Sequence, residues 1–161
     1  MVMGVNLFKD VDTTRAGEVL YISDDIPVQT ILYGVEDVFG KKVYYTEEAD
    51  KYIKDSRIRK RGQQYLIKYL HKIPGILRDP SIVILDSEDV SGETLLYYKE
   101  LFIKEKSRQI LVTLVVKSFM ERIVYNFYPQ ESGKAKICEG KEPPKLLYLK
   151  AGYKRQSYIK R

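Results

Sequence analysis

Tryptophan is absent from this 161-residue chain, cysteine and histidine occur once each, and no long apolar run interrupts the sequence. The single cysteine, Cys138, excludes an intrachain disulfide and a thiolate metal site, and it favours an intracellular compartment. A membrane helix needs about 20 apolar residues, which no segment supplies, and the N-terminus does not resemble a signal peptide. We therefore expect a cytoplasmic protein without membrane contact.

Several familiar site motifs are missing as well. The sequence has no glycine-rich phosphate loop, no cluster of metal-ligating residues and no Ser-His-Asp set. These absences argue against nucleotide hydrolases, zinc enzymes and serine hydrolases. We therefore expect neither a metal ion nor an organic cofactor.

The residues that are present favour one domain with a polar binding surface. The chain fits a single domain over residues 1–161, because domains usually span about 100 to 200 residues. Its aromatic side chains are 14 tyrosines and 5 phenylalanines. A tyrosine packs its ring while its hydroxyl stays in water or hydrogen-bonded, which suits a surface that binds a polar ligand.

Positive charge is concentrated in two places, although the net charge of the whole chain is only +6. Residues 51–78 carry nine basic side chains against Asp55 alone, and residues 145–161 carry six basic side chains and no acidic one. The cations that we single out in the first region are Arg57, Arg59, Lys60, Arg61, Lys68 and Lys72. Clustered cations indicate where a polyanion can lie, since each neutralised phosphate releases counterions. The alternative is a solvated helix surface.

The basic C-terminal extension, residues 145–161, mixes Tyr148, Tyr153 and Tyr158 with its cations. Aromatic rings beside lysine and arginine are typical of single-stranded nucleic-acid binding. The same composition is also found in frayed solubility tails. A third interpretation is that residues 145–149 add a last strand to a sheet.

Helices are expected in the first half of the chain. Asp24 or Asp25 before Pro27 predicts a short helix as far as residue 34, because a side-chain oxygen can cap the first amides. Thr46 followed by acidic residues predicts a second helix as far as Arg57. Apolar residues at three- and four-residue spacings predict a third helix over residues 65–77.

Strands are expected mainly after these helices. Short strands are predicted at 18–22 and 42–45, and longer strand-like runs lie at 81–86, 93–104, 108–117 and 121–129. Strands that are connected this closely are usually antiparallel neighbours. The expected fold class is α+β, with N-terminal helices packed on a four- to five-stranded antiparallel sheet.

Three short motifs within residues 42–130 resemble a known family. They are Ile76–Val83 at a helix-to-strand step, Tyr98-Lys99 in a strand, and Asn126-Phe127-Tyr128 on the last long strand. This order resembles the phage and mobile-element branch of the barnase, EndoU, colicin and RelE-like nuclease superfamily, abbreviated BECR. Members that cleave usually carry a histidine near the positions of Tyr52 or Ile58, and neither residue is a histidine here.

The resemblance implies metal-independent RNA cleavage, in which a ribose 2′-hydroxyl attacks its neighbouring phosphate and a cyclic phosphate forms. This reaction needs a proton acceptor, a proton donor and fixed cations around the phosphate. The candidates for proton transfer are Tyr98, Lys99 and Tyr128. The candidates for holding the phosphate are Arg57, Arg61 and Arg122, through bidentate hydrogen bonds.

Three of the candidate catalytic residues have two interpretations each. His71 is either a general base or a structural, solvent-facing side chain. Lys99 is either a catalytic group or a strand-edge charge that keeps the sheet soluble. Asn126 stands where the family often has a hydroxyl residue, and it either belongs to the site or bonds a neighbouring strand.

We therefore expect a toxin-like or mobile-element endoribonuclease that acts on RNA, with an antitoxin or another acidic protein as a partner. One alternative is a non-catalytic nucleic-acid-binding module with a degenerate nuclease fold. Another is an interaction protein of a phage-like element. The first two interpretations require cations of the helical region and polar groups of the later strands to meet at one hollow.

Overall fold

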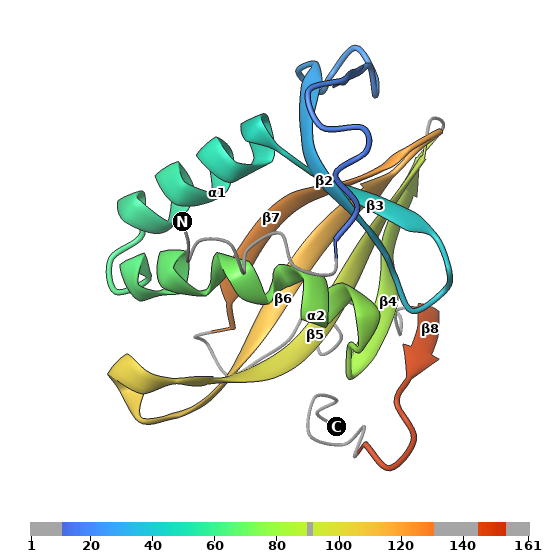
Figure 1. Cartoon of the computed structure of the whole chain (residues 1–161). Coiled ribbons are helices and arrows are strands. Elements are labelled where there is room, and N and C mark those ends of the chain that lie inside the picture. Colours follow the sequence, from blue (N-terminus) through green and yellow to red (C-terminus); the bar gives the residue numbers. More distant parts are fainter. Residues whose placement is uncertain (1–10, 90–91, 131–144, 154–161) are drawn as a thin grey trace.

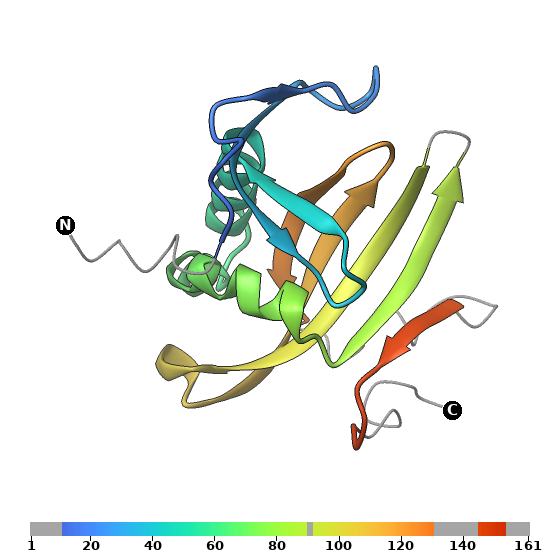
Figure 2. The same cartoon turned by 45° about the vertical axis from the view of Figure 1, so that its right-hand side comes forward.

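Within residues 11–89, 92–130 and 145–153, which the computed structural model describes, eight strands form one mixed sheet (Figures 1 and 2). The strands are β1 (Val19–Leu20), β2 (Gln29–Glu36), β3 (Lys42–Thr46), β4 (Ile82–Asp89), β5 (Gly92–Ile103), β6 (Arg108–Ser118), β7 (Arg122–Pro129) and β8 (Lys145–Leu149). Their order across the sheet is β1-β2-β3-β7-β6-β5-β4-β8. Every neighbouring pair is antiparallel except β3 and β7, which run parallel.

The expected fold of N-terminal helices on a four- to five-stranded antiparallel sheet is wrong. Three strands precede the helices, join the same sheet and bring the count of described strands to eight. The segment expected to be a helix near residues 24–34 instead forms most of β2. Its β-branched and aromatic residues from Thr30 to Val35 favour a strand, and this preference outweighs the capping signal at Asp24 or Asp25.

Three helices lie between β3 and β4. They are α1 (Glu47–Arg59), the 3-10 helix η2 (Gln64–Lys72) and α2 (Ile73–Arg78), and a short 3-10 helix, η3 (Lys104–Lys106), connects β5 to β6. The predicted cap of α1 is confirmed, because the amide of Ala49 donates to the Thr46 hydroxyl over 3.1 Å. None of the described helices is long and apolar enough to cross a bilayer.

The helix expected over residues 65–77 is divided into η2 and α2 at Lys72 and Ile73. Pro74 lies in the first turn of α2. A proline has no amide proton to donate to the preceding turn, but it is well tolerated where a helix begins. The proline therefore explains why a new helix starts at this position.

The segment 145–149 adopts the last of the three interpretations that its sequence allowed. It forms β8 and pairs antiparallel with β4, with Leu149 opposite Ile82 and Leu146 opposite Ile84. The view in Figure 2 shows β8 along the outer edge of β4. Tyr158 lies outside the described residues.

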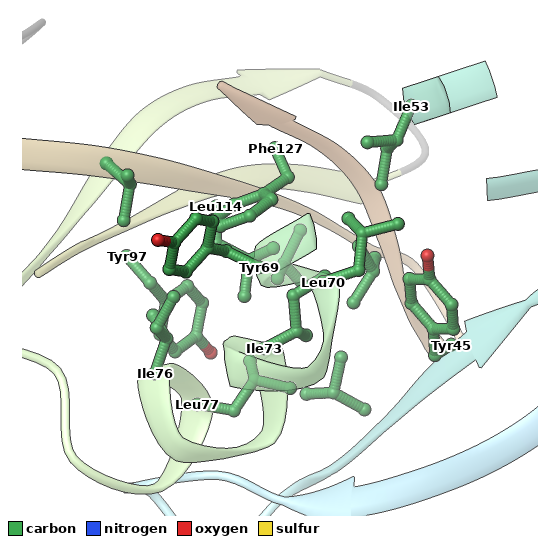
Figure 3. Packing of buried hydrophobic residues seen from close by; sticks show 14 of the residues in the cluster. Tyr45, Ile53, Tyr69, Leu70, Ile73, Ile76, Leu77, Tyr97, Leu114 and Phe127 are labelled. Carbon is green, nitrogen blue, oxygen red and sulfur yellow. The ribbon is translucent and has the colours of Figure 1, made fainter. Parts of the chain in front are cut away.

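The main hydrophobic core lies between the helices and one face of the sheet (Figure 3). Ile53 of α1 and Leu70 and Ile73 of the η2–α2 segment pack toward Tyr97 of β5 and Phe127 of β7. A second cluster on the opposite face contains Ile82, Ile84, Leu96, Tyr98 and Val115. Alternate residues of the same strand therefore enter different clusters, as the pleat of a strand requires.

A buried carboxylate connects the β2–β3 turn to the middle of the sheet. The side chain of Asp37 has no exposed surface. One of its oxygens accepts from the amides of Phe39 and Lys41, each over 2.9 Å. The other accepts from the Tyr97 hydroxyl at 2.5 Å and from Nη1 of Arg122 at 3.1 Å. Four donors therefore compensate the cost of burying this charge.

Replacing Asp37 by alanine is expected to lower the free energy of unfolding by about 3 kcal/mol or more, since the Tyr97 hydroxyl, two turn amides and Nη1 of Arg122 lose this acceptor. Urea unfolding followed by circular dichroism measures this change. The control is Asp55→Ala, which removes an exposed ion pair with Lys51 and should cost about 0.5 kcal/mol or less. Similar small effects in both variants would show that Asp37 does not anchor the turn.

Candidate functional site

Two of the expected catalytic tyrosines lie in one row on the sheet face opposite the η2–α2 segment. Tyr98 of β5 is directly opposite Thr113 of β6, and Thr113 is directly opposite Tyr128 of β7. Residues paired across neighbouring strands point to the same face, so the three side chains share it. Tyr98 is fully buried and Tyr128 is half-buried.

Lys99 does not join this row. It follows Tyr98 in the strand and therefore points to the other face. Its Nζ lies 3.1 Å from Oδ2 of Asp79, which also accepts from Nζ of Lys150 at 2.9 Å. Hydrogen bonds from Lys150 and Lys99 lower the pKa of Asp79. Lys99 thus fastens the end of α2 and the residue after β8 to the sheet.

His71 and Asn126 are also held by local contacts. His71 is exposed on η2, where its ring centroid lies 6.4 Å from that of Tyr69. It lines a hollow of about 350 Å³ between η2, α1 and β2, on the helical side of the sheet. Asn126 shares the face of the tyrosine row, but its Oδ1 accepts from the amide of Phe127 over 2.8 Å. Of the five expected catalytic residues, the structure brings together Tyr98, Tyr128 and Asn126 only.

Arg57 joins the row from α1. The helix runs beside β7, and the guanidinium carbon of Arg57 lies 5.8 Å from the centroid of the Tyr128 ring. Arg57 is only 2% exposed. Its Nε and Nη1 have no hydrogen-bond partner among the described residues. Burial lowers the pKa of this guanidinium, the nearby charge of Arg59 lowers it slightly further, and Tyr52, Tyr128 and Tyr65 oppose the shift.

A buried guanidinium with two unpaired donors is costly, because each buried donor that lacks a partner costs about 1 to 3 kcal/mol. The contact with the Tyr128 ring offsets only part of this cost, since a cation–π contact contributes about 0.5 to 2 kcal/mol. The Nε–H and Nη1 donors lie on different edges of the guanidinium, so a phosphate oxygen can satisfy one of them and a second acceptor is needed for the other.

Exposed cations from α1, the α1–η2 turn, η2 and the β5–β6 hairpin surround this corner of the molecule. We call this group the basic end, and it consists of Arg59, Lys60, Arg61, Lys68, Lys104, Lys106 and Arg108. Figures 1 and 2 show the α1–η2 turn and the β5–β6 hairpin at the same side of the molecule.

Specific contacts hold the hairpin against η2. Nζ of Lys106 lies 5.1 Å from the centroid of the Tyr65 ring. The Tyr69 hydroxyl donates to Glu105 over 2.8 Å and accepts from the amide of Lys104 over 3.0 Å. Lys68 is 3.6 Å from Glu105, the one acidic residue of this hairpin tip. These contacts place the hairpin cations beside those of η2.

The remaining two expected phosphate contacts lie elsewhere. Arg122 is at the start of β7, at the opposite end of that strand from Tyr128, and is paired with Asp37. Lys72 is exposed at the end of η2, away from Tyr65 at its start. Sequence reasoning missed the hairpin cations Lys104, Lys106 and Arg108. These three cations are spaced two residues apart, which could have indicated a positive surface. Acidic residues nearby in the sequence balanced their charge, so a regional charge count did not reveal them.

Comparisons of this chain with known protein families, curated proteins and solved structures found no match. The described residues contain no group of three or more histidine, cysteine or acidic side chains that could hold a metal ion. The chemistry of the site therefore has to be inferred from Arg57, the tyrosine row and the basic end.

Replacing Arg57 by methionine is expected to raise the free energy of unfolding by about 1 to 3 kcal/mol in buffer without phosphate, because the unpaired buried donors disappear. Inorganic phosphate should stabilise the parent protein and not the variant. Thermal unfolding across a phosphate titration measures both effects.

The matched control is Arg59→Met, which removes an exposed guanidinium of the same helix and should change the stability by about 0.5 kcal/mol at most. If Arg57→Met is less stable than the parent protein at every phosphate concentration, Arg57 contributes mainly through packing.

Proposed function

We propose that this chain binds single-stranded RNA at the basic end, in the cytoplasm, with one backbone phosphate held by Arg57. The observation that carries the proposal is the buried guanidinium of Arg57, which has two N–H groups without a partner among the described residues. Buried charges are normally paired, and phosphate is the anion that an RNA backbone repeats at every nucleotide.

The surroundings of Arg57 support a nucleic acid over a small anion. The seven exposed cations of the basic end come from α1, the turn after it, η2 and the β5–β6 hairpin. Such a surface attracts a polyanion and releases its counterions on binding. The Tyr65 ring lies beside Lys106 and the Tyr128 ring beside Arg57, and aromatic rings next to lysine and arginine favour single strands whose bases can stack.

Membership of the BECR nuclease superfamily is part of the same proposal. Its support is the order of α1, η2–α2 and the antiparallel strands β4 to β7, together with the positions of two motifs. Tyr98 and the Asn126–Tyr128 segment lie on strands that are separated by β6 alone.

RNA cleavage is a second candidate, and the alignment of Tyr98, Thr113 and Tyr128 beside Arg57 favours it. In this reaction the ribose 2′-oxygen bonds to phosphorus and gives its proton to water. The bond from phosphorus to the 5′-oxygen breaks, and the 5′-oxygen takes the proton of the Tyr128 hydroxyl, which water then restores. Tyr128 is the residue best placed for proton transfer beside a phosphate on Arg57. Lys99 has no role in this proposed cleavage, because its side chain is paired with Asp79.

RNA binding is tested by its salt dependence. The triple variant Lys104→Gln, Lys106→Gln and Arg108→Gln should weaken binding of an oligoribonucleotide. It should also reduce the slope of log affinity against log salt by about 2, since each single-strand phosphate contact contributes about 0.7. Fluorescence anisotropy at several salt concentrations measures both quantities.

The control carries the same change of net charge at exposed lysines outside the basic end, Lys41→Gln, Lys51→Gln and Lys145→Gln. Equal losses in the two triple variants would show that RNA responds to overall charge and not to this surface.

Cleavage is tested with end-labelled RNA in EDTA, by looking for products that end in a cyclic phosphate. Tyr128→Phe should slow such cleavage by about 100- to 10,000-fold, which is the usual contribution of a general acid or base, while RNA affinity stays within about twofold of the parent value. Lys99→Gln should cleave at the parent rate. Uncut RNA that is retained by the parent protein would leave binding as the function.

A further inference from the structure

The hollow that His71 lines, between η2, α1 and β2, has the size and composition of a small-molecule site. Its volume is about 350 Å³, its walls are mainly apolar, and a few polar side chains converge on it. Pockets for small organic ligands start at about 300 Å³ and combine apolar walls with a few polar groups in this way. The hollow lies on the helical side of the sheet, so it is separate from the tyrosine row.

Two stacked tyrosine rings form one wall of the hollow. Tyr33 of β2 and Tyr45 of β3 are paired across the strands, and their ring centroids are 5.2 Å apart with 21° between the ring planes. Both side chains are buried, and burial raises the pKa of both hydroxyls. Ile67 and Leu70 line the hollow from η2. This uncharged aromatic wall favours a ligand that has an aromatic ring of its own.

A β-bulge adds Leu32 to the same hollow. Ile31 pairs with Thr46 and Tyr33 pairs with Tyr45, so Leu32 is the extra residue of β2. In a regular strand the neighbours Leu32 and Tyr33 would point to opposite faces, whereas both of them line this hollow. Bulges redirect side chains and are frequent next to functional sites. The bulge therefore gives the hollow a second apolar side chain from β2.

Basic side chains from two helices line the rest of the hollow. Lys54 belongs to α1, Lys68 and His71 belong to η2, and all three are exposed. The acidic residue of the hollow is Asp50. Its Oδ1 accepts from the Tyr45 hydroxyl at 2.6 Å, and its Oδ2 lies 2.8 Å from Nζ of Lys54. Lys54 therefore compensates Asp50, and the charge of Lys68 is left in excess.

Lys68 and His71 also have donors available for a ligand. Nζ of Lys68 lies 3.6 Å from Glu105, and an ammonium group has three N–H donors. The His71 ring contacts Tyr69 and has no hydrogen-bond partner among the described residues. An anionic group at the rim can therefore accept from both side chains without breaking a hydrogen bond inside the protein.

We propose that this hollow binds a small aromatic carboxylate. The ring lies against the tyrosine wall and Leu32, and the carboxylate accepts from Lys68 and His71. A neutral aromatic molecule would make the ring contacts only, and the excess positive charge would disfavour an aromatic cation. This binding site goes beyond the proposed RNA function and does not depend on it.

The test uses His71 as a local reporter. It is the only histidine of the chain, so its ring protons can be followed individually by proton NMR at pH 7 without RNA. The probe is 2-naphthoate, and its neutral comparison is 2-naphthamide, which has nearly the same shape. 2-Naphthoate should shift the His71 signals until they saturate. It should bind about 10-fold more tightly than 2-naphthamide, as expected for hydrogen bonds to a charged group.

Variants locate the two parts of the site. Lys68→Gln should weaken 2-naphthoate binding by about two- to fivefold, the range of an exposed ion pair, and leave 2-naphthamide binding unchanged. The matched control is Lys72→Gln, an exposed lysine of the same helix that does not line the hollow, and it should leave both affinities unchanged. Ile67→Trp fills the hollow and should abolish binding of both probes, with thermal unfolding used to verify that the variant is folded.

Three results would overturn the inference. His71 signals that stay in place at millimolar 2-naphthoate would show that the hollow does not take this ligand. Equal affinity for the two probes would show that the hollow does not recognise a carboxylate. Equal losses in Lys68→Gln and Lys72→Gln would assign the effect to overall charge. Each of these results would leave the RNA proposal standing, because that proposal is tested by oligoribonucleotide binding.

Discussion

Four donors meet at the buried carboxylate of Asp37, and the arrangement of the whole sheet depends on that meeting. Two of the donors are amides of the β2–β3 turn, one is the Tyr97 hydroxyl in the middle of β5, and one is the Arg122 guanidinium at the start of β7. The free-energy cost of removing this charge from water is compensated only while all four donors stay in place. The carboxylate therefore fixes the position of the β2–β3 hairpin against the strands that follow the helices.

The functional corner is a consequence of that junction. Two residue pairs connect β3 to β7 in parallel, Val43 with Arg122 and Tyr44 with Ile123. The chain then leaves the sheet at Thr46 and continues as α1, which runs beside β7. Because β3 runs parallel to β7 and α1 follows β3 directly, α1 continues in the direction of β7. Tyr52 therefore contacts Tyr125, and Arg57, farther along the helix, contacts Tyr128. An antiparallel β3 would have sent the helix to the other end of β7.

Local signals in the sequence predicted part of this arrangement. The cap at Thr46 and the break before β4 depend on neighbouring residues, and both could be read directly. Neighbouring residues of a strand point to opposite faces, a rule that conflicts with assigning both Tyr98 and Lys99 to one catalytic site. The structure resolves that conflict in favour of the alternation rule, with Lys99 paired to Asp79.

Contacts between distant segments could not be predicted from those signals. The parallel pairing of β3 with β7 joins residues about 80 positions apart, and no local pattern specifies a partner at that distance. The approach of Lys106 to Tyr65 has the same origin. A charge count over consecutive residues missed the basic end, because the end is assembled from two helices, the turn between them and a hairpin.

The pairing of β8 with β4 has a consequence for how the chain matures. Among the described strands, β8 is the last in sequence, and it covers backbone groups of β4 that would otherwise face outward. A growing chain therefore completes seven strands while one border of its sheet is still open to unwanted association. The backbone pairing of β8 with β4 closes this border once synthesis has reached β8, and Lys150 adds an exposed ion pair with Asp79 just past the strand.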